Sequence, residues 1–333
     1  MITAVPVEFL DSDLEAEVLD DLARVEDVLT ATAHPSDGLL TEASRHLMSA
    51  GGKRFRAMLV LLAARFGDPQ DPRVIQAAVA MELTHLATLF HDDVMDEALV
   101  RRGSPSVNSR WGNSVAILAG DFLFAQASEI LAGLGPLAVR IQARTFSRLV
   151  SGQLAETVGP HPDQDPLDFY MHVITEKTGS LIATSGQFGA LFSGAPEQIA
   201  DRIAVACEQL GVAWQLSDDV IDIASDSAQS GKTPGTDLRQ GVRTLPVLYA
   251  LRSAVQSPAD ARLRWLLTEA DLADDALLAD ALRLLRGHHA MKESRADVLH
   301  WLLGARNEIM ALPDVPARAA FLALCDFVEK RTG

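Results

Sequence analysis

The sequence contains two acidic clusters of one pattern, Asp92-Asp93-Val94-Met95-Asp96 and Asp218-Asp219-Val220-Ile221-Asp222. If each cluster lies in a helix, its first and last aspartates are about 40° apart around the axis, so the carboxylates share one face. Each cluster interrupts an apolar stretch, and negative charges that face the interior of a helical bundle are costly unless cations or metals accompany them. Carboxylate oxygens suit Mg²⁺, which also binds water and phosphate oxygens. The pattern therefore predicts a site for Mg²⁺ and a diphosphate.

A simpler reading of each cluster is a solvated acidic patch or a helix N-terminal cap, a position where aspartate is common. For one cluster alone, the two readings would carry equal weight. Two clusters with the same spacing, each followed by basic residues, favour the metal and diphosphate site.

Basic residues follow both clusters, as a diphosphate site requires. Arg101-Arg102 comes after the first cluster and Lys232 after the second. Earlier in the chain, Gly51-Gly52-Lys53-Arg54-Phe55-Arg56 is expected to open a helix, where free N–H groups and the helix dipole favour an anion. Lys53 and Arg56 would then stand one turn apart. Taken alone, this segment would more often be a helix start with surface charges.

Three further positions place polar groups in mostly apolar helical segments. Lys177-Thr178-Gly179-Ser180 would either turn a carbonyl and a hydroxyl inward, toward a cationic intermediate, or kink the helix for packing. His85 precedes Asp92 on an apolar face, where a buried histidine bonded to a neighbour is the usual explanation. Gln215 points near the face of Asp219 and could supply a neutral hydrogen-bond donor there.

Helices must position these groups, because apolar residues recur at helical spacing along most of the chain and strand-like alternation is absent. The breaks between the helical windows are short, and none has the composition of an interdomain linker. We therefore expect a single all-α domain over residues 1–333, in which residues 1–10 are flexible. The expected helices span about residues 12–32, 37–49, 53–66, 72–98, 112–132, 135–158, 165–193, 196–226, 244–256, 258–271, 274–288, 290–311 and 314–330.

Charge and composition exclude several classes of protein. The formal net charge of −16 argues against a nucleic-acid partner, which would need a basic face. Residues 1–18 lack the basic and apolar regions of a secretory signal, and no stretch reaches the roughly 18 apolar residues of a transmembrane segment. The two cysteines offer no disulfide framework, so we expect a cytoplasmic protein. The acidic segment 268–281 is interpreted as a solvated helix face, with a mobile flap as the alternative.

In their order along the chain, the motifs over about residues 40–250 resemble those of the trans-isoprenyl diphosphate synthases, also called the polyprenyl synthetase family. The resemblance implies a single all-α bundle around a deep central cavity, usually a homodimer. The family often has proline where Ala57 stands, and because that proline chiefly stiffens a helix start, we expect no loss of activity. The matching segments are Gly-Gly-Lys-Arg-Phe-Arg (51–56), Glu82-Leu-Thr-His85, His91-Asp-Asp-x-x-Asp96, Arg101-Arg-Gly103, Gly120-Asp-Phe-Leu123, Lys177-Thr178, Gln215-x-x-Asp-Asp-x-x-Asp222 and Gly231-Lys232-x-x-Gly235-x-Asp-Leu238.

The same resemblance implies roles for individual residues and moves His85 from a structural to a functional role. Isopentenyl diphosphate would be bound by Lys53, Arg56, His85 and Arg102. The allylic diphosphate would be bound by Arg101, Lys177, Thr178, Gln215 and Lys232. The leading metal ligands would be Asp92, Asp96 and Asp218, assisted by Asp93, Asp219 and Asp222. About three Mg²⁺ ions per active site are implied, and Mn²⁺ could replace them.

The implied reaction begins with ionisation of the allylic diphosphate, assisted by metal and cationic side chains, after which isopentenyl diphosphate attacks the carbocation. Product length would be set by the helix wall before Asp92, where Ala87 and Thr88 are small. Because an aromatic ring there would close the tunnel and these side chains would not, we expect about six to ten isoprene units (C30–C50), as in a quinone side chain. Phe124, Trp214 or a partner subunit could still close the tunnel, so a geranylgeranyl or farnesyl product is the alternative.

Three other readings share part of the pattern. A class I terpene cyclase normally lacks the second aspartate cluster and needs no site for isopentenyl diphosphate. A non-catalytic subunit of a heteromeric synthase would be expected to lack one cluster or a basic ligand. A Mg²⁺ phosphohydrolase of the HD type would need His-Asp pairs beyond His91-Asp92. The complete set of motifs favours prenyl transfer.

Overall fold

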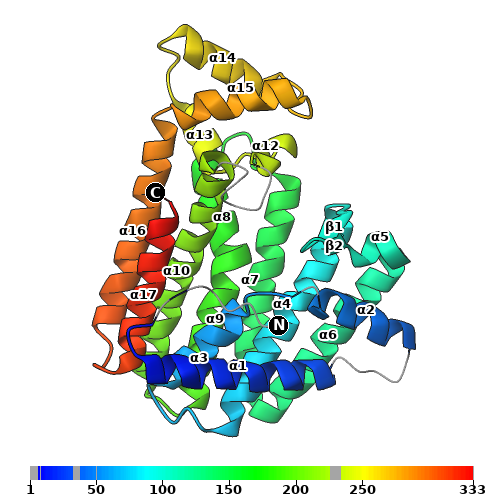
Figure 1. Ribbon diagram of the computed structural model, residues 1–333, viewed down its shortest axis with the longest axis vertical. Helices are drawn as coiled ribbons and strands as arrows, with labels where there is room; N and C mark the ends of the chain where they lie inside the picture. Colours follow the sequence, from blue (N-terminus) through cyan, green and yellow to red (C-terminus); the bar gives the residue numbers. More distant parts are fainter. Residues whose placement is uncertain (1–6, 8, 33–37, 50, 226–233, 333) are drawn as a thin grey trace. The chain divides into compact units, whose positions relative to one another are not determined.

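The computed structural model describes residues 7, 9–32, 38–49, 51–225 and 234–332, and this part of the chain is helical apart from one small hairpin (Figure 1). The predicted all-α class is confirmed. The hairpin pairs β1 (Val100–Arg101) with β2 (Ser104–Pro105). The helices are α1 (Ser12–Thr32), α2 (Gly38–Ser49), α3 (Phe55–Ala64), α4 (Pro72–Met95), α5 (Val107–Trp111), α6 (Asn113–Leu134), α7 (Pro136–Val158), α8 (Pro166–Ile174), the π-helix η1 (Thr175–Gly179), α9 (Ser180–Phe192), α10 (Glu197–Ala224), α12 (Thr236–Arg239), α13 (Leu245–Arg252), α14 (Pro258–Thr268), α15 (Asp275–Arg286), α16 (Ala290–Met310) and α17 (Pro316–Arg331).

The chain divides into two compact units, each built from three stretches of sequence. Unit 1 consists of Met1–Ser147, Leu181–Cys207 and Glu308–Ala323. Unit 2 consists of Arg148–Ser180, Glu208–Asn307 and Leu324–Gly333. The expectation of a single domain stays a prediction.

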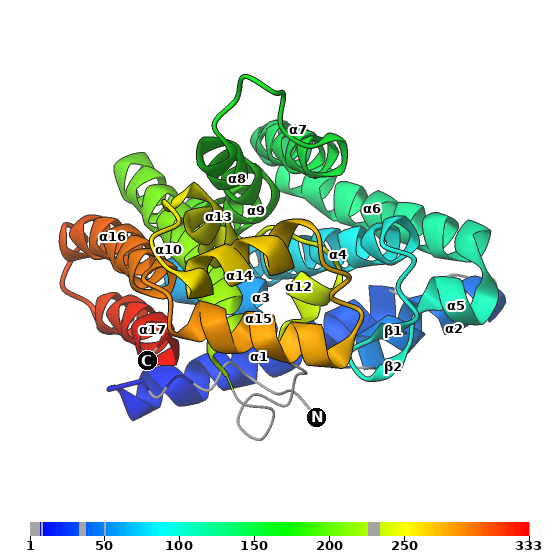
Figure 2. The same cartoon turned by 90° about the horizontal axis from the view of Figure 1, so that it is seen from above.

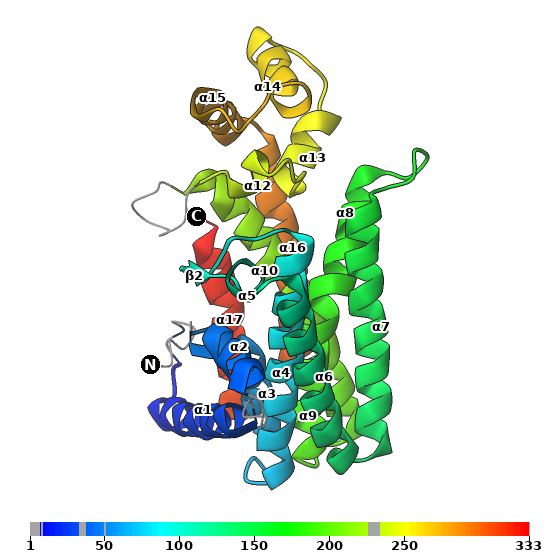
Figure 3. The same cartoon turned by 90° about the vertical axis from the view of Figure 1, so that its right-hand side faces the viewer.

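The core of unit 1 is formed by α3 and by the buried face of α4. Every side chain of α3 from Ala57 to Ala64 is buried, as expected for a helix that is apolar all round. α4 lies beside α6 along its length (Figure 3). Small residues permit close packing in this core: a Cβ atom at Gly189 of α9 would lie 2.1 Å from the carbonyl oxygen of Val60 in α3, and one at Gly120 of α6 would lie 3.2 Å from the carbonyl oxygen of Ala87 in α4. Unit 1 therefore holds α4, which carries the first acidic cluster, by tight backbone approach.

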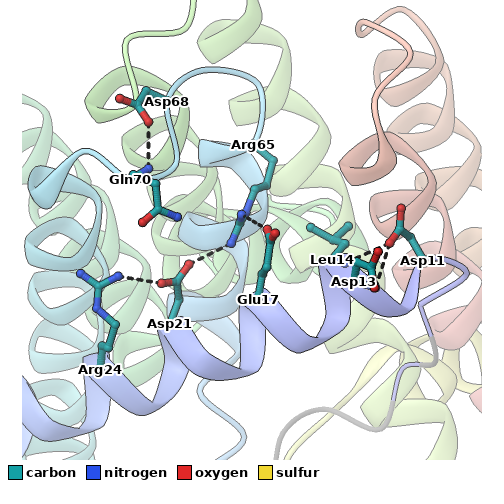
Figure 4. A network of polar contacts seen from close by, with 9 residues as sticks. All are labelled: Asp11, Asp13, Leu14, Glu17, Asp21, Arg24, Arg65, Asp68 and Gln70. Atoms are coloured by element: carbon teal, nitrogen blue, oxygen red, sulfur yellow. Dashed lines mark hydrogen bonds and ion pairs between the residues drawn. The ribbon is translucent and has the colours of Figure 1, made fainter.

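The N-terminal helix α1 is attached to α3 by a polar network around Arg65 (Figure 4). The Arg65 guanidinium donates to Asp21 at 2.8 Å and also binds Glu17. Asp21 accepts a second hydrogen bond from Arg24 at 2.9 Å. Arg65 and Asp21 are largely buried, so this network stabilises the contact between α1 and α3 and is unrelated to the predicted site.

Unit 2 contains a second apolar core that supports α12 and the end of α10. α14 and α15 follow one another in the chain and lie side by side (Figure 2). Gly235, which precedes α12, has a φ of 75° and faces Leu278 and Leu282 of α15, where a Cβ atom would come within 3.2 Å of both side chains. The core residues are Val220, Ile223, Leu238, Val247, Ala250, Leu263, Leu278, Leu282, Leu285, Ala290 and Met291.

Most predicted helices are present, with three local differences. The stretch predicted as one helix over 165–193 is divided into α8, η1 and α9. α3 begins at Phe55, two residues later than predicted, because the preceding residue has a left-handed backbone. The hairpin and the short helices α5 and α12 were not predicted, since such short elements show no apolar periodicity.

The acidic segment 268–281 forms the turn between α14 and α15 and the first half of α15. Asp274 caps α15 by accepting from the backbone N–H groups of Ala276 and Leu277. Arg239 of α12 donates to Asp275 at 2.5 Å and to the Ala273 carbonyl at 2.8 Å. The segment is thus mostly a capped and paired helix face.

One helix, α6, is long and apolar enough to cross a membrane by length and composition. Only 33% of its most apolar window is buried, so this helix presents an unusual amount of apolar surface for a core helix. The expectation that the chain has no transmembrane segment stays a prediction.

Candidate active site

The first acidic cluster lies at the end of α4, and its three aspartates have different surroundings. Asp92 is half-buried, whereas Asp93 is only 1% exposed. The Nε–H of Arg101 donates to Asp93 Oδ1 at 2.6 Å. Asp96 is exposed and lies just after the last residue of α4. The three aspartates thus differ in exposure, and Asp93 binds Arg101; the expectation that their carboxylates converge on one face stays a prediction.

The β1–β2 hairpin directs its two arginines to different partners. Arg102 and Gly103 form its turn with φ angles of 52° and 76°. Arg101 binds Asp93 of α4, whereas Arg102 donates to the carbonyl oxygen of Gly51. A Cβ atom on Gly52 would lie 2.9 Å from the Arg102 guanidinium, so a larger residue there would displace this guanidinium. The hairpin thus brings two motifs that are distant in sequence into contact.

A buried arginine fixes the loop before α3. Arg54 has a left-handed backbone (φ 46°, ψ 39°), is 4% exposed and donates to Glu26 at 2.7 Å. Its guanidinium also lies 3.9 Å from Glu82 of α4, which is 2% exposed. Glu82 accepts from the backbone N–H of Ala57 at 3.1 Å. The proline that the family often has at position 57 could not donate this hydrogen bond. Alanine at this position therefore keeps a bond between the start of α3 and Glu82 of α4.

The residues predicted to bind isopentenyl diphosphate include a cationic group gathered within unit 1. Burial lowers the pKa of Arg56 to about 10, with nearby Arg102 acting in the same direction and Glu82 opposing both. Burial, followed by the charges of Arg56 and Arg102, lowers the pKa of His85 well below its usual value. His85 is therefore neutral at pH 7 and can donate or accept a hydrogen bond. Lys53, the fourth predicted residue, is exposed at the loop.

In the second cluster, the first and second aspartates bind different side chains. Asp218 is half-buried and accepts a hydrogen bond from Arg331, whose guanidinium lies 4.4 Å from the centre of the Trp214 ring. Asp219 is 2% exposed and accepts a hydrogen bond from the hydroxyl of Tyr170. Burial raises the pKa of Asp219 to about 7 against the opposing effect of the Tyr170 hydrogen bond.

Two further groups complete the surroundings of this cluster. The side-chain amide of Gln215 donates to Asp219 at 3.4 Å, which agrees with the predicted proximity of the two residues. The Asp222 carboxylate accepts from the backbone N–H groups of Thr236 and Asp237, at 3.2 and 3.3 Å, and so caps α12. Each aspartate of the cluster thus has its own partner, and only the second is fully enclosed by protein.

Lys177 and Thr178 lie in the π-helix η1, not in a regular α-helix. Lys177 pairs with Glu156 of α7, and the preceding Glu176 pairs with Arg148 of α7 at 2.7 Å. Between these two ion pairs, a Cβ atom on Gly152 would lie 2.7 Å from the Lys177 backbone nitrogen. The predicted irregularity of this segment is confirmed. The ion pair with Glu156 directs the Lys177 side chain toward α7.

Within the described residues, no group of three or more His, Cys, Asp or Glu side chains forms a preassembled metal site. Each unit nevertheless holds residues of the kind that fit Mg²⁺, because Asp92 and Asp96 of unit 1 and Asp218 of unit 2 are partly or fully exposed carboxylate residues. Mg²⁺ is commonly bound by one or two carboxylates together with substrate phosphates and water, so a closed protein cage is not required.

The helix wall predicted to control product length is packed against α6. Ala87 is fully buried, and a Cβ atom on Gly120 of α6 would lie 3.2 Å from its carbonyl oxygen and 2.4 Å from His91 Nε2. The Thr88 hydroxyl donates to the carbonyl oxygen of His85 at 2.8 Å. Beyond His91, the ring of Phe124 lies 5.7 Å away. The wall is therefore lined by small or internally bonded groups at positions 87 and 88.

Lys232 lies outside the described residues. Four side chains that contact the predicted residues or act on their charge were not identified from the sequence: Arg54, Glu82, Tyr170 and Arg331. Glu82 stood in a quoted motif without a role, whereas Arg331 lies beyond the part of the chain with recognised motifs. The one sequence feature that sets Tyr170 apart is the rarity of its residue type, since the chain contains only 2 tyrosines.

An all-α fold with two aspartate clusters and a separate group of cationic side chains defines a class of enzymes that act on diphosphates through divalent metals. The chain belongs to the polyprenyl synthetase family, whose model matches residues 37–285. This confirms the family inferred from the motifs and the assignment as a prenyltransferase, and the family is known to depend on divalent metals.

Individual relatives match nearly the whole chain. The chain is 47% identical over 328 residues to a nonaprenyl diphosphate synthase of Mycobacterium tuberculosis, which covers 98% of this chain and 97% of that protein. A geranylgeranyl pyrophosphate synthase from Corynebacterium glutamicum, solved with calcium and isoprenyl diphosphate, is similar with a TM-score of 0.88 and 45% identity, covering 98% and 100%. A decaprenyl diphosphate synthase from Rhodobacter capsulatus is similar with a TM-score of 0.86 and 31% identity, covering 97% and 99%.

Proposed function

We propose that this chain is a Mg²⁺-dependent prenyltransferase that condenses isopentenyl diphosphate with an allylic prenyl diphosphate to form a trans-polyprenyl diphosphate. The observation that carries the proposal is the division of labour within each acidic cluster. The second aspartate is buried and bonded to protein, while Asp92 and Asp218 stay partly accessible. Such a carboxylate can bind a metal that arrives with a diphosphate, while the buried neighbour holds its helix.

Isopentenyl diphosphate would bind to the cationic group of unit 1. Arg56 and Arg102 supply positive charge, and the neutral ring of His85 supplies a hydrogen bond without adding charge repulsion. Lys53 at the exposed edge of the loop would bind the outer phosphate oxygens. Glu82 and Arg54 do not contact substrate in this proposal, and they hold the loop in its left-handed conformation.

The allylic diphosphate would recruit cations that are already paired with carboxylates. Arg101 pairs with Asp93, and Lys177 pairs with Glu156, so each cation is oriented before substrate binds. Thr178, Gln215 and Lys232 would add hydrogen bonds. Mg²⁺ held by Asp92, Asp96 and Asp218, with Asp93, Asp219 and Asp222 assisting through position, would stabilise the negative charge of the departing diphosphate. Arg101 and Lys177 stabilise the same charge from the protein side.

The product is proposed to be long, about C30–C50, because no large ring projects from positions 87 and 88. Similarity to nonaprenyl and decaprenyl diphosphate synthases supports a medium or long product. Ala87 packs against the α6 helix at Gly120, so any larger side chain at 87 would have to take space from the neighbouring interior.

A homodimer is proposed on the basis of apolar surface in unit 1. Ile117 and Leu118 of α6 are 42% and 61% exposed, and Leu137 and Val139 of α7 are also exposed. An exposed apolar face of this kind commonly marks a protein interface, which explains the membrane-like composition of α6 without a membrane. A cytoplasmic location fits the two buried cysteine thiols, which are not joined in a disulfide.

The experiment that tests this function measures transfer of labelled isopentenyl diphosphate to farnesyl diphosphate by the purified protein, with Mg²⁺ and with a chelator. Transfer that requires Mg²⁺, is lost in Asp218→Ala and is retained in Asp314→Ala supports the proposal, since Asp314 is an exposed carboxylate paired with Arg318. Release of diphosphate from the allylic substrate alone, without transfer, would instead indicate a cyclase.

A further inference from the structure

Asp219 is enclosed by hydrogen-bond donors from three helices of unit 2. Its Oδ2 atom accepts from the hydroxyl of Tyr170 in α8 and from the backbone N–H of Leu245 in α13, the latter at 3.4 Å. Its Oδ1 atom accepts from Gln215, one turn earlier in α10, at 3.4 Å. With 2% of its surface exposed, this carboxylate has little access for a metal ion. Asp219 therefore acts on its neighbours in the helix and not on the substrate.

The neighbours of Asp219 are the groups that the proposed function assigns to the diphosphate. Asp218 precedes it and is partly exposed, and Asp222 follows one turn later and caps α12. Because all three lie on one helix, the rotation of α10 about its axis decides where the Asp218 and Asp222 carboxylates point. A bond that fixes Asp219 fixes this rotation.

Tyr170 also belongs to the element that carries Lys177. α8 ends at Ile174 and continues directly into η1, where Lys177 and Thr178 lie. The Tyr170 hydroxyl thus joins the helix that leads to the lysine to the helix of the aspartates.

We propose that Tyr170 is a positioning residue for the second acidic cluster: through its hydrogen bond to Asp219 it sets the orientation of Asp218 and Asp222 for Mg²⁺ and the diphosphate. This inference rests on the proposed function. It assigns Tyr170 no contact with substrate. Residues that orient metal ligands in this way typically change metal affinity or activity by about 10- to 100-fold when they are removed.

Tyr170→Phe is the direct test, because it removes the hydroxyl and keeps the ring. Tyr249→Phe is a matched control, since Tyr249 donates in the same way to Asp297, at 2.5 Å, in another part of unit 2. Titration calorimetry of inorganic diphosphate into the full-length protein at fixed Mg²⁺ measures the site without turnover. We expect Tyr170→Phe to weaken this binding about 10-fold and Tyr249→Phe to leave it unchanged.

Steady-state kinetics separate positioning from general destabilisation. Tyr170→Phe is expected to raise the Mg²⁺ concentration for half-maximal rate and to lower kcat, with an unchanged KM for isopentenyl diphosphate. Equal changes in both tyrosine variants, or wild-type diphosphate binding in Tyr170→Phe, would overturn the inference. If the unaltered protein transfers no prenyl group, the proposed function fails; if it does and Tyr170→Phe matches it, only the role of Tyr170 fails.

A double-mutant cycle tests whether Tyr170 acts through Asp219. Asp219→Asn keeps an oxygen that can accept from Tyr170 but has a weaker acceptor, so Tyr170→Phe should have a smaller effect on inorganic diphosphate binding in the Asp219→Asn background. Additive effects of the two substitutions would show that Tyr170 does not act through Asp219, and would contradict the proposal.

Discussion

Arg101 Nε lies 2.6 Å from Asp93 Oδ1, and this ion pair holds the buried aspartate of the first cluster. The preceding Asp92 is only half-buried. In the second cluster, Tyr170 has the corresponding relationship to Asp219. The two clusters share a sequence pattern and use different chemical groups to hold the same position. In the proposed function, the second aspartate of each cluster therefore has a mainly positional role.

The first prediction separates Asp92 from Asp93. Asp92→Ala should lower turnover by orders of magnitude and leave the fold intact, because the lost carboxylate is a proposed metal ligand at the accessible face. Asp93→Ala, in contrast to Asp92→Ala, should lower the free energy of unfolding by about 1–3 kcal/mol, because Arg101 loses its partner and a buried space opens. Denaturant unfolding and turnover assays measure the two effects. Near-normal turnover in Asp92→Ala would refute the metal assignment.

The second prediction concerns the close approach of α6 to α4. A Cβ atom on Gly120 would lie 2.4 Å from His91 Nε2, next to Asp92, so Gly120→Ala should destabilise the fold by about 1–3 kcal/mol and slow turnover. Gly133→Ala in the same helix meets no atom within 4 Å and is the matched control. It should be neutral or stabilising by about 0.5 kcal/mol. Equal thermal unfolding midpoints for the two variants would contradict the packing described here.

The third prediction concerns product length. Ala87→Phe should shorten the product, because a ring at this buried position would block the interior along which the chain grows. Ala87→Val, a smaller change, should give an intermediate distribution. Chromatography of dephosphorylated products measures both. An unchanged distribution in an active Ala87→Phe enzyme would show that another residue limits the chain.

The fourth prediction concerns oligomeric state. Leu118→Asp should convert a dimer into a monomer, because it places a charge in the exposed apolar face of α6. Leu303→Asp on α16 is a suitable control, since Leu303 is 58% exposed and belongs to unit 2. Size-exclusion chromatography with light scattering gives the mass of each variant. A wild-type protein that is monomeric at micromolar concentration would contradict the proposed dimer.

Helix positions could be predicted from the sequence because apolar periodicity reports which face of a segment is buried. The same periodicity could not reveal the π-helix at Lys177, which is contacted by Gly152 and Arg148 of a different helix. It also could not show that Arg54 would adopt a left-handed backbone, which is uncommon for arginine and is supported by Glu26.

For the site, residue type and spacing identified the clusters and the proximity of Gln215 to Asp219. They did not show that Asp93 and Asp219 are enclosed, because equal spacing does not reveal which partner occupies each carboxylate. Arg101 and Tyr170 come from other elements of the fold, and their pairing with the aspartates is set by tertiary packing. Sequence spacing thus predicts which residues share a helix face, but it does not predict their hydrogen-bond partners.

The most direct test of the central claim is the product distribution formed by the purified chain from isopentenyl diphosphate, farnesyl diphosphate and Mg²⁺, measured by chromatography after dephosphorylation. We predict all-trans polyprenols of about six to ten isoprene units, formed only with Mg²⁺. Absence of condensation with any allylic primer would contradict the assignment as a prenyltransferase, and products that stop at four units or fewer would contradict a long-chain synthase.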